Sequence, residues 1–146
     1  MATSDLLAEA DACFTRGEEL AKDENNYKEA SANYIAAGQI REEQLGLRDR
    51  QTGLCYLRGC AQYRLPFGAQ ISRKRQVLLV AIGMLQDPAN ADLLADCYNE
   101  MGKTYLPQAR GDRSQDYQTG VTTFQVARDL YARTGIESAA RVETLR

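Results

Sequence analysis

The sequence predicts an all-α fold: a single domain over residues 1–146, built from three antiparallel helical hairpins and a short C-terminal helix. Along most of the chain apolar residues recur at intervals of three and four, which is typical of amphipathic helices, and no stretch has the alternation of a strand. One spacing of aromatic and small residues also returns ninety residues later. Its two copies are Tyr27, Ala30, Tyr34, Ala37 and Tyr117, Gly120, Phe124, Ala127.

The first hairpin is expected over approximately residues 4–44. Ser4 and Asp5 offer an N-cap and a first-turn acid for its first helix. A polar turn over residues 22–26 separates this helix from a second one, which begins near Tyr27 and carries the first copy of the repeated spacing.

The middle hairpin is expected over residues 46–86 and is less regular. A helix is predicted over residues 47–65, with apolar residues round much of its circumference, as for a helix that has neighbours on both sides. Pro66 and Gly68 interrupt it. A further helix is predicted over residues 71–86, with Ser72 as a possible cap.

The third hairpin is expected over residues 88–134. Asp87 is suited to cap it, and Pro88 to occupy the first helical position, where its missing N–H is not needed. The turn inside this hairpin, over residues 107–116, is the longest polar connection. After Gly135, a seventh helix over residues 136–146 would cover the exposed end of the stack.

A family resemblance rests on small and aromatic residues at fixed spacing. In the third hairpin Gly102 is followed three positions later by Tyr105, and Phe124 precedes the small Ala127. This pattern resembles the tetratricopeptide-repeat class, which implies a right-handed superhelical stack that binds proteins in a concave groove. Gly17, Gly59 and Gly102 recur at intervals of 42 and 43 residues. Since a standard repeat is about 34 residues long, the chain is more similar to the long-helix arrays of vesicle-fusion SNAP adaptors or of some bacterial regulators.

The charge of the chain is small overall but unevenly distributed. A net charge of −2 and a pI near 5.2 give no general attraction to nucleic acid or to anionic membranes, and no apolar run is long enough to span a membrane. Between Arg50 and Gln86, however, there is no Asp or Glu. The basic residues of this segment could meet an acidic partner or an acidic neighbouring hairpin. They are Arg50, Arg58, Arg64, Arg73, Lys74 and Arg75.

The residue types argue against an enzyme. The chain has no histidine, which excludes His-based triads, Cys-His dyads and the common zinc motifs, and no Gly-rich phosphate loop is present. The four cysteines lie on or beside apolar helical stripes and form no Cys-x-x-Cys motif, so we expect buried free thiols. No cofactor or metal is expected. Free thiols also indicate a reducing compartment, either cytoplasmic or nuclear.

The resemblance places the partner-binding groove beside the small residues of the first helix of each hairpin. Its predicted lining is Phe14, Thr15 and Glu18 in the first unit, Tyr56, Cys60, Tyr63 and Arg64 in the second, and Asn99, Glu100 and Lys103 in the third. The basic residues Arg73, Lys74 and Arg75 form a second candidate surface. The alternative is that these side chains pack between helices.

The sequence therefore predicts a non-enzymatic interaction module, an adaptor or scaffold, that binds a protein or peptide through its groove or its basic middle unit. A structural subunit fixed in a large assembly is one alternative, and a SNAP-like vesicle-fusion adaptor is another.

Overall fold

The fold consists of α-helices and short 3-10 helices, and the all-α prediction is confirmed. A computed structural model describes residues 2–46, 48–64, 66–106 and 113–134, and no strand occurs within these ranges. The elements are α1 (Thr3–Ala21), η1 (Glu24–Asn26), α2 (Tyr27–Leu45), α3 (Arg50–Ala61), α4 (Ala69–Met84), η2 (Pro88–Asn90), α5 (Ala91–Lys103) and α6 (Arg113–Thr134).

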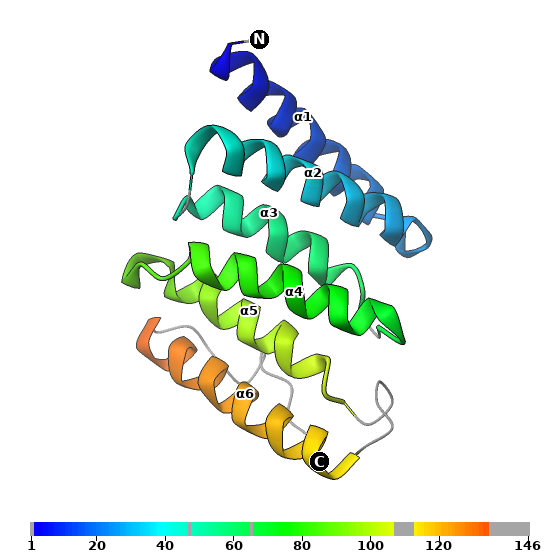
Figure 1. The fold of residues 1–146 in the computed structure, drawn as a ribbon, viewed down its shortest axis with the longest axis vertical. Helices are drawn as coiled ribbons and strands as arrows, with labels where there is room; N and C mark the ends of the chain where they lie inside the picture. The colour runs from blue at the N-terminus through cyan, green and yellow to red at the C-terminus, as the bar shows by residue number, and fades with distance from the viewer. Residues whose placement is uncertain (1, 47, 65, 107–112, 135–146) are drawn as a thin grey trace.

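The helices stack in chain order. Each helix from α2 to α6 packs on the one before it, as Figure 1 shows, and α3 also contacts α5 across the middle of the stack. The helix pairs α3/α4 and α5/α6 fall within the second and third predicted hairpins, and the α1/α2 pair extends one residue beyond the first at each end. The predicted capping helix over residues 136–146 lies outside the described residues, as does most of the turn over 107–116.

Glycines let aromatic rings of the next helix lie directly on a helix backbone. A Cβ atom on Gly17 of α1 would lie 3.1 Å from the ring of Tyr34 in α2, and one on Gly102 of α5 would lie 2.6 Å from Phe124 Cε1 in α6. The Phe124 ring of α6 therefore lies directly against the α5 backbone. In the middle unit Gly59 instead faces Ile35 of the preceding hairpin, so its packing differs from that of the other two units.

The middle helices begin and end at different residues from those predicted. Gly46 and Arg48 have positive φ angles of 76° and 74°, and the Asp49 carboxylate accepts a hydrogen bond of 2.9 Å from the Thr52 N–H, so α3 begins at Arg50 rather than at 47. The helix ends at Ala61, before the predicted end at 65.

The next helix also starts earlier than predicted. α4 begins at Ala69, after Gly68 (φ 55°), so the predicted cap Ser72 lies inside the helix. At the other end of the unit the predicted capping is confirmed: the Asp87 carboxylate accepts a hydrogen bond of 2.9 Å from the Ala89 N–H, and Pro88 occupies the first helical position of η2. In the first helix the N-cap is Ala2, not Ser4.

Apolar side chains are buried in three clusters along the stack. The largest joins α3, α4 and α5 and includes Leu78, Leu85 and Met101. A second joins α5 and α6 around Phe124, and a third lies between α1, α2 and α3 around Ala37. The core is thus distributed along the whole stack and is not concentrated at one place.

Candidate functional site

The first feature is a hollow formed by residues from α1, α3 and α5, called here the groove hollow. It has a volume of about 510 Å³ and combines small or apolar side chains with amide and charged groups. Its lining is Ala21, Ala61, Gln62, Arg64, Glu100, Lys103 and Leu106. These residues lie near the C-terminal ends of α1, α3 and α5 or directly after them. Arg64, Glu100 and Lys103 belong to the predicted groove lining, and the other seven predicted residues do not line this hollow.

A second hollow lies where the turns of the first two hairpins meet, and is called here the turn hollow. It has a volume of about 240 Å³ and is lined by Ala21, Glu24, Tyr27, Gln62, Tyr63, Arg64, Phe67 and Gln70. The rings of Tyr27 and Tyr63 meet edge to face, with centroids 5.2 Å apart. Phe67 is 68% exposed at this hollow. Three residues, Ala21, Gln62 and Arg64, line both hollows.

Arg64 belongs to both hollows and forms an ion pair with Glu24. Its Nη1 lies 2.9 Å from Glu24 Oε1, and the two side chains are 76% and 79% exposed. Exposed pairs of this kind contribute about 0–1 kcal/mol because water already solvates both charges. The Arg64 guanidinium is therefore readily available to another carboxylate.

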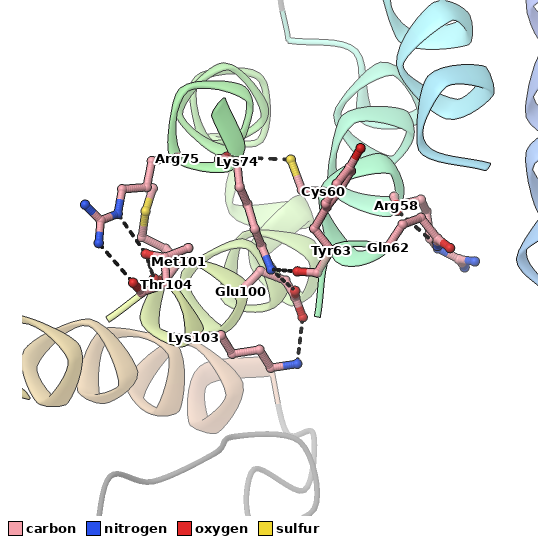
Figure 2. A network of polar contacts seen from close by, with 10 residues as sticks. All are labelled: Arg58, Cys60, Gln62, Tyr63, Lys74, Arg75, Glu100, Met101, Lys103 and Thr104. Carbon is pink, nitrogen blue, oxygen red and sulfur yellow. Dashed lines mark hydrogen bonds and ion pairs between the residues drawn. The ribbon is translucent and has the colours of Figure 1, made fainter. Parts of the chain in front are cut away.

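A buried ion network includes two residues that line the groove hollow, Glu100 and Lys103, and Figure 2 shows its side chains. The Lys74 ammonium, on a side chain that is 1% exposed, donates to Glu100 Oε1 at 3.0 Å and to the Tyr63 carbonyl oxygen at 2.8 Å. The other oxygen of Glu100 accepts from Lys103 at 2.9 Å. Burial by itself would raise the pKa of Glu100, but the two ammonium groups outweigh burial and hold that pKa below its ordinary value. Through the Tyr63 carbonyl oxygen, the network connects α4 and α5 to the segment that follows α3.

Arg75 is also occupied within the fold. Its guanidinium donates to Thr104 Oγ1 at 2.9 Å and to the Thr104 carbonyl oxygen at 3.0 Å, and it lies 3.8 Å from the centroid of the Tyr105 ring. The basic run predicted as a surface thus separates into three environments. Only Arg73 of the three is exposed, while Lys74 is buried and Arg75 half-buried.

Two more of the predicted groove residues are buried. Tyr56 donates a hydrogen bond of 2.6 Å to Glu42 and is 5% exposed, and Asn99 is 7% exposed. On α1, Phe14 packs edge to face on Tyr34 at 5.2 Å, while Glu18 is exposed. Cys60 and Glu100 are buried as well, at 3% and 9% exposed. Five residues assigned to the surface from the sequence therefore lie largely in the interior: Tyr56, Cys60, Lys74, Asn99 and Glu100.

The structure gathers four residues of the predicted set around the two hollows: Tyr63, Arg64, Glu100 and Lys103. It adds residues that the sequence reasoning did not select, chiefly Gln62 and Phe67. Phe67 had a signal of its own: a large apolar residue between Pro66 and Gly68, in a segment that cannot continue a helix.

Three of the four cysteines are too deeply buried to form a reactive site. All four are free; Cys55, Cys60 and Cys97 are buried, and Cys13 is half-buried. Burial raises the pKa of the Cys55 thiol to about 11 and that of Cys60 to about 12, which keeps both protonated at neutral pH. Within the described ranges no group of three Cys, Asp or Glu side chains could hold a metal ion. In those same ranges no helix has the length and apolar character needed to cross a membrane.

Comparison with known proteins does not identify a family. The sequence matches no protein-family model, and no curated protein and no solved structure matches it. The tetratricopeptide-like arrangement therefore stays a prediction.

Proposed function

We propose that this chain is a protein-interaction module, without catalytic activity of its own, that binds a segment of a partner protein in the groove hollow. The observation that carries the proposal is the origin of the lining: residues at the ends of α1, α3 and α5, separated in sequence, converge on one hollow of about 510 Å³. A tetratricopeptide-like superhelix, and an adaptor role of the SNAP type, would be compatible with this use of the first helices.

The chemistry of the lining suits a polypeptide. Gln62 offers an amide, Arg64 and Lys103 offer cations, and Ala21 and Leu106 offer apolar contact. Peptide segments present carbonyl oxygens, amide groups and apolar side chains together, so this mixture is what a protein-binding surface needs. A reducing compartment, cytoplasmic or nuclear, belongs to the same proposal and is supported by the four free cysteines.

The test is photo-cross-linking from defined positions. A photoreactive amino acid is placed at Gln62, which lines both the groove hollow and the turn hollow, and in a separate variant at Gln125, an exposed position on α6. The tagged protein is cross-linked in native cell extract, and the adducts are identified by mass spectrometry. We expect a discrete protein adduct from position 62 and none of the same mass from position 125. Equal labelling from both positions, or no adduct from either, would contradict the proposal.

A structural subunit of a large assembly is a second candidate, favoured by exposed apolar side chains on α4. The adjacent residues Leu79 and Val80 are 60% and 42% exposed. Apolar interfaces survive high salt, whereas charge-led binding weakens steeply as salt rises. A partner that stays bound through a wash at about 1 M salt, where screening acts over about 3 Å, would favour the fixed subunit.

A further inference from the structure

We propose that the turn hollow is a recognition site for one apolar side chain, aromatic or large aliphatic, of a partner peptide, and that Arg64 binds a carboxylate next to that side chain. This proposal rests on the proposed function, since it assumes that the ligand is a protein segment. It adds the chemistry of that segment.

The size and lining of the turn hollow indicate an apolar side chain. Its volume of about 240 Å³ is smaller than the range of about 300–1,000 Å³ typical of small-molecule and cofactor sites. The edge-to-face pair of Tyr27 and Tyr63 and the exposed Phe67 ring present aromatic surface. Aromatic rings on a concave surface favour another ring or a large aliphatic group, because such a side chain buries a large apolar area while few of its rotatable bonds become fixed.

A narrower pit continues from the turn hollow between α2 and α4. It has a volume of about 50 Å³, shares Tyr63 and Gln70 with the turn hollow, and includes the apolar side chains of Ile35 and Val77. Arg73 also lines this pit. The pit extends the apolar path, so it would admit the end of a long side chain.

The charges around this path favour an acidic ligand. Arg64 lies at the turn hollow and Arg73 at the pit, and the segment from Arg50 to Gln86 contains no Asp or Glu. The acidic residue that lines the turn hollow is Glu24, which Arg64 already neutralises. Because that ion pair is largely exposed, a carboxylate from a partner can replace Glu24 as the partner of Arg64 at little cost.

The exchange at Arg64 gives the proposal a directional test. Changing Glu24 to Gln removes the competing carboxylate and should strengthen binding, whereas Arg64→Glu should abolish the acidic preference. Phe67→Ala removes aromatic surface at a position that is already 68% exposed, so the fold should be unaffected. Lys22 and Glu19 form a matched control: they are an ion pair of 3.2 Å, 72% and 66% exposed, outside both hollows.

The experiment is selection of a displayed library of random peptides, about twelve residues long, against the wild-type chain. The selected peptides are then measured by fluorescence anisotropy on each variant. We expect enrichment of sequences with an aromatic or large aliphatic residue within two positions of Asp or Glu. On such peptides Phe67→Ala should weaken binding about fivefold to thirtyfold. Glu24→Gln should strengthen it up to about fivefold, and Lys22→Glu should leave it unchanged.

Different failures have different meanings. Selected peptides that lack an acid, or whose binding is unaffected by Phe67→Ala and Arg64→Glu, would overturn this proposal and leave the interaction module intact. Failure to select any peptide, together with no adduct from position 62, would overturn both. Binding of the wild-type chain to vesicles with anionic lipid, lost in Phe67→Ala, would also overturn the proposal, because it would assign Phe67 and its basic neighbours to a membrane surface.

Discussion

Replacement of Lys74 by Met tests whether this lysine is part of the fold rather than of a basic surface. Met fills a similar volume but supplies no donor to Glu100 or to the Tyr63 carbonyl oxygen, which lie 3.0 Å and 2.8 Å from the ammonium. Removing one partner of a buried ion pair costs about 3–5 kcal/mol, because the other charge stays buried. Lys103 still contacts Glu100, so we expect a loss near the lower end, about 3 kcal/mol.

The assay is urea unfolding followed by far-UV circular dichroism at pH 7. With an m-value of about 1.5 kcal/mol/M, the loss corresponds to a midpoint lower by about 2 M. The double variant Lys74→Met with Glu100→Met removes both charges and should recover most of the loss, because an apolar pair can replace a buried ion pair at little cost. Arg73→Met is the matched control. Because the neighbouring Arg73 side chain is exposed, the unfolding free energy of this variant should differ from that of the wild type by no more than about 0.5 kcal/mol.

The effect of pH follows from the lowered pKa of Glu100 in the folded protein. A depressed carboxyl pKa contributes stability that is fully present above the unfolded value of about 4.3 and is lost as the pH falls through the folded value. Without Lys74 the buried carboxyl is easier to protonate, and a protonated Glu100 needs no cation. The difference between wild type and Lys74→Met should therefore shrink from pH 7 to pH 4. An unchanged midpoint at pH 7, or a difference that grows on acidification, would refute the reasoning.

Two further predictions concern packing and thiol accessibility. Gly102→Ala places a Cβ 2.6 Å from Phe124 Cε1 and should lower the unfolding free energy by about 1–2 kcal/mol, because overpacking outweighs the better helix propensity of Ala. Gly83→Ala is the control: its Cβ would meet no neighbouring side chain within 4 Å, so the same urea titration should show an unfolding free energy raised by up to about 1 kcal/mol. With Ellman's reagent at pH 8, the half-buried Cys13 should react promptly, and the three buried thiols should react only when the protein unfolds. Rapid reaction of two or more thiols in the folded protein would contradict this burial.

Local features of the fold could be predicted from the sequence because they depend on neighbouring residues. Helix periodicity and the Asp87 cap with Pro88 were of this kind, and the structure confirms them. The start of α3 was placed too early, because left-handed conformations at Gly46 and Arg48 precede it. Arg48 gives no signal for such a conformation in the sequence.

The candidate site was harder to predict because it depends on residues far apart in the chain. Lys74 lies between two arginines and was assigned to an exposed basic run, but its partner Glu100 is 26 positions away. Phe67 lines the turn hollow because the turn of the first hairpin lies beside that of the second. The contact between Glu24 and Arg64, 40 positions apart, joins these two turns. Apolar periodicity carries no information about such pairings.

The polar contacts on α5 have a geometric consequence for the whole stack. Asp92, near the first turn of α5, pairs with Arg50 at 2.8 Å, while Glu100 and Thr104, at its other end, bind Lys74 and Arg75. Hydrogen bonds are directional, and contacts at both ends of a rod prevent it from pivoting about its middle. The second hairpin therefore fixes the tilt of the third, and weakening one end of α5 would change the distance between the two ends of the stack while each helix stayed intact.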